Sequence, residues 1–174
     1  MRWPQTAALC LLLAVAGCSD EATVGAAVPR EPDSRATGYY CGMALSEHTG
    51  SYGQLLLRGW NEPLWFSSAR DALTYMGQDL VSEDEIAGFW VNDMGTGPSG
   101  KPAPGTWVEA KSAWYVIASR KTATMGGLEI VPFKDRGKAE AFAKEFGGRI
   151  VAYTAAVKET SEALVADGAS GDSP

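Results

Sequence analysis

A cluster of proline and glycine residues near the middle of the chain most constrains how it can fold. Residues 98–105 read PSGKPAPG, and prolines and glycines at this density interrupt both helices and strands. The residues on either side are therefore expected to form separate units joined by a connector. Each side can be read as strand, strand, helix and strand, so the sequence predicts two similar small modules.

The first predicted module spans residues 38–97. The extended run at 39–45 is expected to be its first strand, and the stretch GQLLL at 53–57 its second. After Phe66, one of two serines can cap a helix, in which apolar side chains then recur at helical spacing. The stretch GFWVNDM at 88–94 is expected to close the module as a strand.

The second predicted module spans residues 105–155 and follows the same order. It is expected to start at 107–108 and to form strands at 113–119, 127–131 and 149–153. A helix between the last two strands ends at a pair of glycines. Two ββαβ-like modules belong to the α+β fold class, although one α+β domain with similar pieces would leave the same pattern.

The length and charge of the chain limit its partners. Its 174 residues suffice for one ordinary domain or two very small ones. A net charge of −6 leaves no basic stripe that could neutralise phosphates, so no nucleic-acid partner is expected.

The N-terminus is typical of an exported protein. Residues 1–17 combine Arg2 with a short apolar run that ends in VAGC, which resembles the bacterial lipobox. Residues 1–17 are therefore expected to be a lipoprotein signal peptide, with Cys18 as the lipidated residue. A plain signal peptide or a short anchor remains an alternative. The lipid would hold a periplasmic domain at the cell membrane, inner or outer.

Two segments outside the modules lack an apolar period. Residues 18–37 are small, charged and proline-containing, and they are expected to form a flexible tether. Residues 156–174 end in ADGASGDSP and are expected to form a disordered acidic tail.

The cysteine count leaves one thiol in the mature protein. Cys10 lies in the apolar run and would be removed, whereas Cys18 would carry lipid. Cys41 then has no intrachain disulfide partner. In an oxidising compartment such a thiol is either buried and inert or is protected and used.

This thiol is one of three soft or borderline metal donors that lie close together in the sequence. If residues 39–45 form a strand, Cys41 and Met43 point to the same face, since strand side chains alternate. His48, the only histidine of the chain, follows in a polar loop that can fold back toward them. Thiolate, thioether and imidazole donors together favour Cu(I). Each residue also has an ordinary interpretation, as core packing for the sulfurs and as a solvated surface group for the histidine.

At these residues the chain resembles the NosL family, the lipoprotein accessory factors of nitrous-oxide reductase maturation. The matching pieces are CGM at 41–43, EHTG at 47–50, GQLLL at 53–57, WFSSARDALTY at 65–75, WVNDMG at 90–95, Trp107, WYVIAS at 114–119, MGGLEIVPF at 125–133 and AFAKEFGGRIV at 141–151. Thr49 is a departure, because the family usually places proline there.

The resemblance implies a copper chaperone that carries Cu(I) to the copper centres of nitrous-oxide reductase during denitrification. Its docking partner would be an ABC-type maturation complex in the membrane. The resemblance also implies a fold of two ββαβ-like modules related to organomercurial lyase. By position, Cys41 and Met43 are the implied ligands with His48 as the third, while Met94 and Met125 are further candidates.

Two rival functions use the same residues differently. Cys41 and His48 could be the nucleophile and base of a cysteine-dependent lyase or hydrolase, although a chaperone is not expected to be an enzyme. A structural lipoprotein would instead keep Cys41 buried and unreactive. A c-type haem protein is not expected, because the chain has no Cys-x-x-Cys-His.

Overall fold

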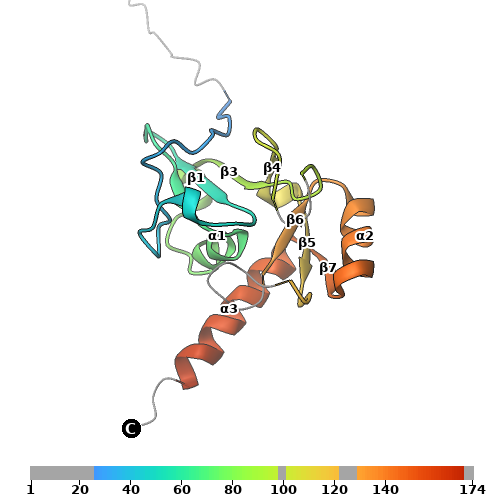
Figure 1. Ribbon diagram of the computed structural model, residues 1–174. Coiled ribbons are helices and arrows are strands. Elements are labelled where there is room, and N and C mark those ends of the chain that lie inside the picture. The colour runs from blue at the N-terminus through green and yellow to red at the C-terminus, as the bar shows by residue number, and fades with distance from the viewer. Residues whose placement is uncertain (1–25, 98–100, 122–128, 171–174) are drawn as a thin grey trace, which may run out of the picture.

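The computed structural model describes residues 26–97, 101–121 and 129–170, and it places them in an α+β fold (Figure 1). The predicted fold class is confirmed. Two antiparallel sheets lie side by side, and three α-helices pack around them within these residues. The predicted signal peptide and Cys18 lie outside the described residues.

The first sheet contains four strands in the order β2-β1-β3-β4. The apolar run that predicted a strand forms β1 (Gly53–Leu57), which lies between β2 (Leu64–Phe66) and β3 (Ile86–Asn92). Helix α1 (Ala69–Met76) connects β2 to β3 and packs on β1 and β2. Its buried residues are Ala69, Ala72, Leu73 and Tyr75, which give the helix one apolar face.

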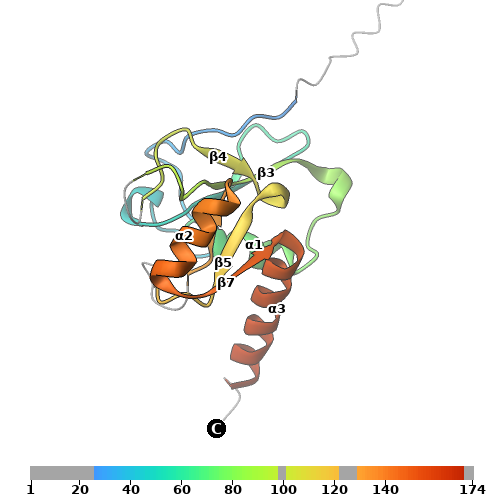
Figure 2. The same ribbon diagram turned by 90° about the vertical axis from the view of Figure 1, so that its right-hand side faces the viewer.

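The second sheet contains three strands in the order β6-β5-β7. Strand β5 (Trp114–Ile117) lies between β6 (Val131–Phe133) and β7 (Arg149–Ala152). Helix α2 (Arg136–Phe146) connects β6 to β7, and Figure 2 shows it beside β5 and β7. In both units the first strand is central and the helix joins the second strand to the third, so the two units repeat one topology.

Residues 39–45 do not form the predicted strand. They form turns between the isolated bridge partners Thr37 and Ala44, followed by a short 3-10 helix (Leu45–Glu47). Tyr39 and Tyr40 are both exposed, so the segment lacks the alternation that a half-buried strand requires. The first strand of the first unit is therefore β1, which the prediction had placed second.

The start of the predicted second module joins the first sheet instead. Residues Trp107–Glu109 form β4, and Val108 pairs with Val91 of β3. Strand β3 would otherwise present an open edge, and β4 satisfies its backbone hydrogen-bonding groups. The chain thus runs antiparallel to β3 along this edge before the second unit begins.

The segment predicted as a disordered tail is largely helical. Helix α3 spans Tyr153–Ser170, and within the described range no helix has the length and apolar character needed to cross a bilayer. Ala156 and Thr160 are buried, and Gly77 at the end of α1 lets Val157 and Ser161 approach closely. The contact with α1 stabilises a helix that its weak apolar pattern does not reveal.

The end of the predicted flexible tether also lies against the fold. Arg30 and Gln54 exchange two hydrogen bonds of 2.9 Å between the Arg30 backbone and the Gln54 side-chain amide. Ala36 is buried, and its carbonyl accepts a 3.0 Å hydrogen bond from the Leu45 N–H. This backbone pairing holds the segment in place ahead of the Cys41 loop.

One hydrophobic core joins the two units. It contains Leu55 and Phe66 of the first sheet, Tyr115 and Ile117 of β5, and Ala156 of α3. The alternate β5 residue, Val116, faces a smaller cluster beneath α2, together with Val131, Phe133 and Ala139. Strand β5 is therefore buried on both faces, which accounts for its uninterrupted apolar sequence.

Candidate metal centre

Cys41 and Met43 lie in a tight loop that its own backbone closes. The Gly42 N–H donates to the Gly38 carbonyl at 2.8 Å, and the Gly38 N–H donates to the Met43 carbonyl at 3.0 Å. Gly42 has a φ of +65°, a conformation that a residue with a Cβ adopts only with strain. The Tyr39 N–H donates to the Trp65 carbonyl at 2.7 Å and anchors the loop to β2.

The Cys41 thiol is partly buried among three polar groups. Its Sγ lies 3.7 Å from His48 Nε2, 3.7 Å from Ser67 Oγ and 4.0 Å from the Gly38 carbonyl oxygen. The predicted meeting of Cys41 with His48 is present in the structure. It results from two consecutive turns rather than from a strand followed by a loop.

His48 is not the solvated surface group of the ordinary interpretation. Its side chain is buried, and its backbone N–H donates to the Leu45 carbonyl at 3.0 Å. The Tyr52 hydroxyl donates to the carbonyls of His48 and Leu45 at 3.0 and 2.9 Å. Burial raises the pKa of Tyr52, so its hydroxyl keeps the proton that makes these bonds. The imidazole is therefore presented to the thiol by a rigid support.

The separation of the two donors suits a shared metal ion. A thiolate sulfur lies about 2.3 Å and an imidazole nitrogen about 2.0 Å from a bound zinc ion. Two donors at those distances and an angle of about 120° at the ion are about 3.7 Å apart. The Cys41 Sγ and His48 Nε2 atoms are at 3.7 Å, so a similar first-row ion fits between them without rearrangement of the loop.

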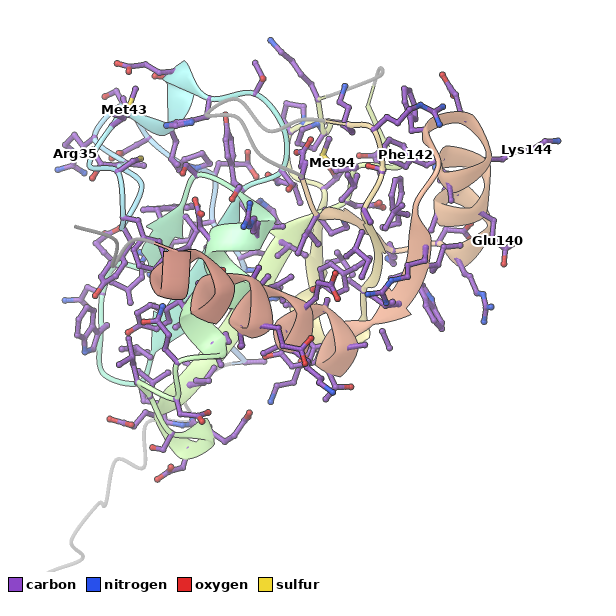
Figure 3. All side chains as sticks on the ribbon, turned by 90° about the horizontal axis from the view of Figure 1, so that it is seen from below. Arg35, Met43, Met94, Glu140, Phe142 and Lys144 are labelled. Atoms are coloured by element: carbon purple, nitrogen blue, oxygen red, sulfur yellow. The ribbon has the colours of Figure 1, made fainter. Side chains whose placement is uncertain are left out.

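Met43 follows Cys41 by two residues in the same loop and is exposed. Its side chain is 37% exposed, and Tyr39 and Tyr40 beside it are exposed by 49% and 47%. Figure 3 shows Met43 near Arg35, on the loop and at the edge of the molecule. Met43 is thus more exposed than Cys41 and His48.

The start of α1 brings two residues to the thiol that sequence reasoning did not assign to the site: Ser67, just before the N-cap, and Asp71 in the first turn. Ser67 Oγ accepts from the Cys41 thiol and donates to Asp71 Oδ2 at 2.9 Å. Ser68 caps the helix by accepting from the Asp71 N–H at 3.0 Å. In the sequence, the four-residue spacing of Ser67 and Asp71 across a helix start was the one pattern that could have indicated that their side chains meet. Their distance from Cys41 along the chain hid the contact.

The comparison with protein families matches residues 29–161 to the family described as NosL. This chain belongs to the NosL family. The copper-binding lipoprotein NosL of Achromobacter cycloclastes is 38% identical over 143 residues, covering 80% of this chain and 73% of that protein. The copper-binding lipoprotein NosL of Stutzerimonas stutzeri is 30% identical over 135 residues, covering 76% of this chain and 65% of that protein.

A solved NosL structure has the same fold. The crystal structure of the copper chaperone NosL from Shewanella denitrificans matches with a TM-score of 0.66 and 28% identity, covering 73% of this chain and 93% of that one. The family prediction is thus confirmed by sequence and by structure. The relation to organomercurial lyase stays a prediction.

Met94, a further candidate ligand in the NosL motifs, does not lie at the Cys41–His48 pair. Met94 is partly buried and packs with the cluster beneath α2, and Figure 3 shows it well apart from Met43. Met125 lies outside the described residues. Among the described residues, no group of three or more His, Cys, Asp and Glu side chains could hold a metal ion. A site at Cys41 and His48 therefore needs a further donor of another kind, and the Met43 thioether lies in the same loop.

Proposed function

We propose that this NosL-family protein is a periplasmic, membrane-anchored copper chaperone. Its relatives are named copper-binding lipoproteins and a copper chaperone. The observation that carries the proposal is the 3.7 Å approach of the Cys41 thiol to the buried His48 imidazole, in a loop that also bears Met43.

The cargo is Cu(I). Cys41 and Met43 supply soft sulfur donors and His48 supplies nitrogen, and Cu(I) is favoured by thiolate and thioether ligands. Loading removes the proton of the Cys41 thiol, because the thiolate is the form that binds metal. A three-donor set leaves the ion open to an incoming ligand, which a carrier needs in order to release its cargo.

In this proposal the three donors have different tasks. The buried imidazole and the sheltered thiol hold the ion, whereas the exposed Met43 thioether contacts whatever approaches from solvent. Copper can then pass to a partner through ligand exchange at Met43 while Cys41 still holds it. The exposed Tyr39 and Tyr40 provide apolar contact area around this exchange.

Delivery is to nitrous-oxide reductase during assembly of its copper centres, and an ABC-type maturation complex in the membrane is the docking partner. The lipid on Cys18 keeps the domain at the membrane surface, where it meets the complex. A Cys18→Ser variant is expected to leave the membrane fraction. Its folded domain is expected to bind Cu(I) as the wild type does.

The binding proposal is tested by titrating the reduced protein with Cu(I) against a chromophoric Cu(I) chelator. We expect one ion per chain, with binding lost in Cys41→Ala. Met43→Leu is expected to weaken binding, whereas Met94→Leu, the same change in the core beneath α2, is expected to leave it unchanged. A wild-type protein that leaves a desalting column without copper would refute the proposal.

The delivery proposal needs a separate experiment. Copper-loaded protein is mixed with copper-free nitrous-oxide reductase and the maturation complex in membrane vesicles, and the return of the reductase copper spectrum is followed. Wild-type protein is expected to restore the spectrum, and Cys41→Ser is not. Equal restoration by free Cu(I) and by the loaded protein would contradict a delivery role.

The Cys41–His48 contact also favours a second candidate function. A thiol beside an imidazole is the arrangement of a nucleophile and its base, so a cysteine-dependent lyase or hydrolase is the alternative. Such an activity in metal-free protein, lost in Cys41→Ala and His48→Ala and inhibited by Cu(I), would support the alternative over the chaperone.

A further inference from the structure

Glu129 is a buried carboxyl group that the copper site does not use directly. Its side chain is 3% exposed, and it belongs to the second unit, just before β6. The Ser51 backbone N–H donates a hydrogen bond to its carboxylate. Ser51 lies three residues after His48, so a residue of the second unit contacts the loop that carries a proposed ligand.

The contact also shapes the backbone of that loop. Gly50 has a φ of +111°, and a Cβ built on it would lie closer than 3.0 Å to Glu129 Oε1. On the other side, the Ser51 hydroxyl accepts a 3.3 Å hydrogen bond from the Ala69 N–H at the start of α1. The Gly50–Ser51 segment is therefore held between Glu129 and α1.

The carboxyl group of Glu129 is costly to bury. Burial raises the pKa of Glu129, against the opposing effects of Ser51 and Lys121, so its surroundings disfavour the charged form. An apolar side chain of similar size would avoid this desolvation cost but would leave the buried Ser51 N–H without its acceptor. Costly groups of this kind are often kept where they position a functional residue.

We propose that Glu129 is a positioning residue of the copper site. Its carboxylate fixes the Gly50–Ser51 segment, which together with Tyr52 holds the His48 imidazole at binding distance from the Cys41 sulfur. The second unit is then a part of the metal site, although it contributes no ligand among the described residues. The inference rests on the proposed function, because it assigns a role in Cu(I) binding.

The test compares the Cu(I) affinities of full-length variants by competition with a chromophoric chelator. Glu129→Leu keeps the volume and removes the acceptor, and it is expected to weaken binding about tenfold, as is usual when a partner that orients a ligand is lost. Glu129→Gln keeps an acceptor oxygen for the Ser51 N–H and is expected to restore binding to near the wild-type value. Thermal unfolding is followed in parallel, and Glu129→Leu is expected to remain folded at the temperature of the binding assay.

A double-mutant cycle shows whether Glu129 acts through His48. In a His48→Ala background, Glu129→Leu is expected to have no further effect on affinity. X-ray absorption of copper-loaded Glu129→Leu is expected to show the loss of imidazole scattering. Wild-type affinity in Glu129→Leu, or additive losses in the double variant, would overturn the inference while leaving the proposed function intact. Failure of the wild type to bind Cu(I) would overturn both.

Discussion

At the scale of single residues, the space around the Cys41 thiol is set by a glycine. A Cβ on Gly38 would lie 2.7 Å from Cys41 Sγ and 3.2 Å from Ser67 Cβ. The backbone of Gly38 is not in the left-handed region, so a side chain there is disfavoured by crowding, mainly from the thiol and also from Ser67, and not by backbone strain. The placement of the sulfur thus depends on the absence of a methyl group.

We therefore expect Gly38→Ala to weaken Cu(I) binding about tenfold with little loss of stability, because the thiol can rotate away while the loop stays folded. Chelator competition measures the affinity, and the rate of thiol labelling reports the new position of the sulfur. Gly137→Ala on α2, remote from the site, is the matched control and should bind like the wild type. Unchanged affinity in Gly38→Ala would contradict this account of the site.

The burial of Glu129 also predicts how the stability of the protein depends on pH. Because burial raises its pKa above the ordinary 4.5, the folded protein keeps this proton to a higher pH than the unfolded chain does. The contribution of Glu129 to the free energy of unfolding therefore decreases as the pH rises from about 4.5 to the folded-state pKa. Urea denaturation across this range should show a more negative slope in the wild type than in Glu129→Gln. Identical pH dependence in the two proteins would show that the carboxyl is not destabilised by burial.

At the scale of elements, the two equivalent helices have equivalent caps but different neighbours. Ser68 caps α1, and Asp135 caps α2 by accepting from the Lys138 N–H at 2.9 Å. Ser67, just before the N-cap of α1, bonds both the Cys41 thiol and Asp71 in the first turn of the helix. Helix α2 packs instead on the strands of the second sheet (Figure 1).

Replacing either cap with alanine is expected to lower the free energy of unfolding by about 1 kcal/mol. Only Ser68→Ala is expected to weaken Cu(I) binding as well, because fraying of α1 releases the Ser67–Asp71 pair from Cys41. Denaturant titration and chelator competition on Ser68→Ala and Asp135→Ala measure the two effects. Equal affinities in the two variants would mean that α1 does not support the thiol.

At the scale of the whole molecule, the two units are joined by reciprocal contacts. The Lys134 N–H of the second unit donates to Asp93 Oδ1 at 3.1 Å, and the Met94 N–H donates to the Pro132 carbonyl at 3.0 Å. Glu129 of the second unit adds a third contact, because its carboxylate accepts a hydrogen bond from the Ser51 N–H of the first unit. Helix α3 continues from β7 and packs on α1, so the end of the chain stabilises the unit that carries the site.

The role of α3 is tested with two neighbouring alanines. Ala156 is fully buried and Ala155 is exposed, so Ala156→Asp places a charge in the core whereas Ala155→Asp leaves it in water. We expect a loss of about 3 kcal/mol or more for Ala156→Asp and little change for Ala155→Asp, measured by denaturant unfolding. Equal stabilities would mean that this segment is the disordered tail that its composition indicates.

The sequence by itself determined the features that depend on near neighbours. The apolar run at 53–57 identified a strand, the serines after Phe66 identified a helix start, and the short motif from Cys41 to His48 indicated a soft metal site. These features follow from backbone propensity and side-chain chemistry over a few residues.

Only the tertiary structure decided which distant residues meet. The alternation rule failed at 39–45 because hydrogen bonds within the loop and to β2 replace a sheet ladder. Strand β4 joined the first sheet because β3 offered it an edge, and α3 is helical because α1 covers one of its faces. Ser67 reaches Cys41 across 26 residues, and Glu129 reaches Ser51 from the other unit. Such contacts depend on burial and packing over the whole fold, which no local pattern encodes.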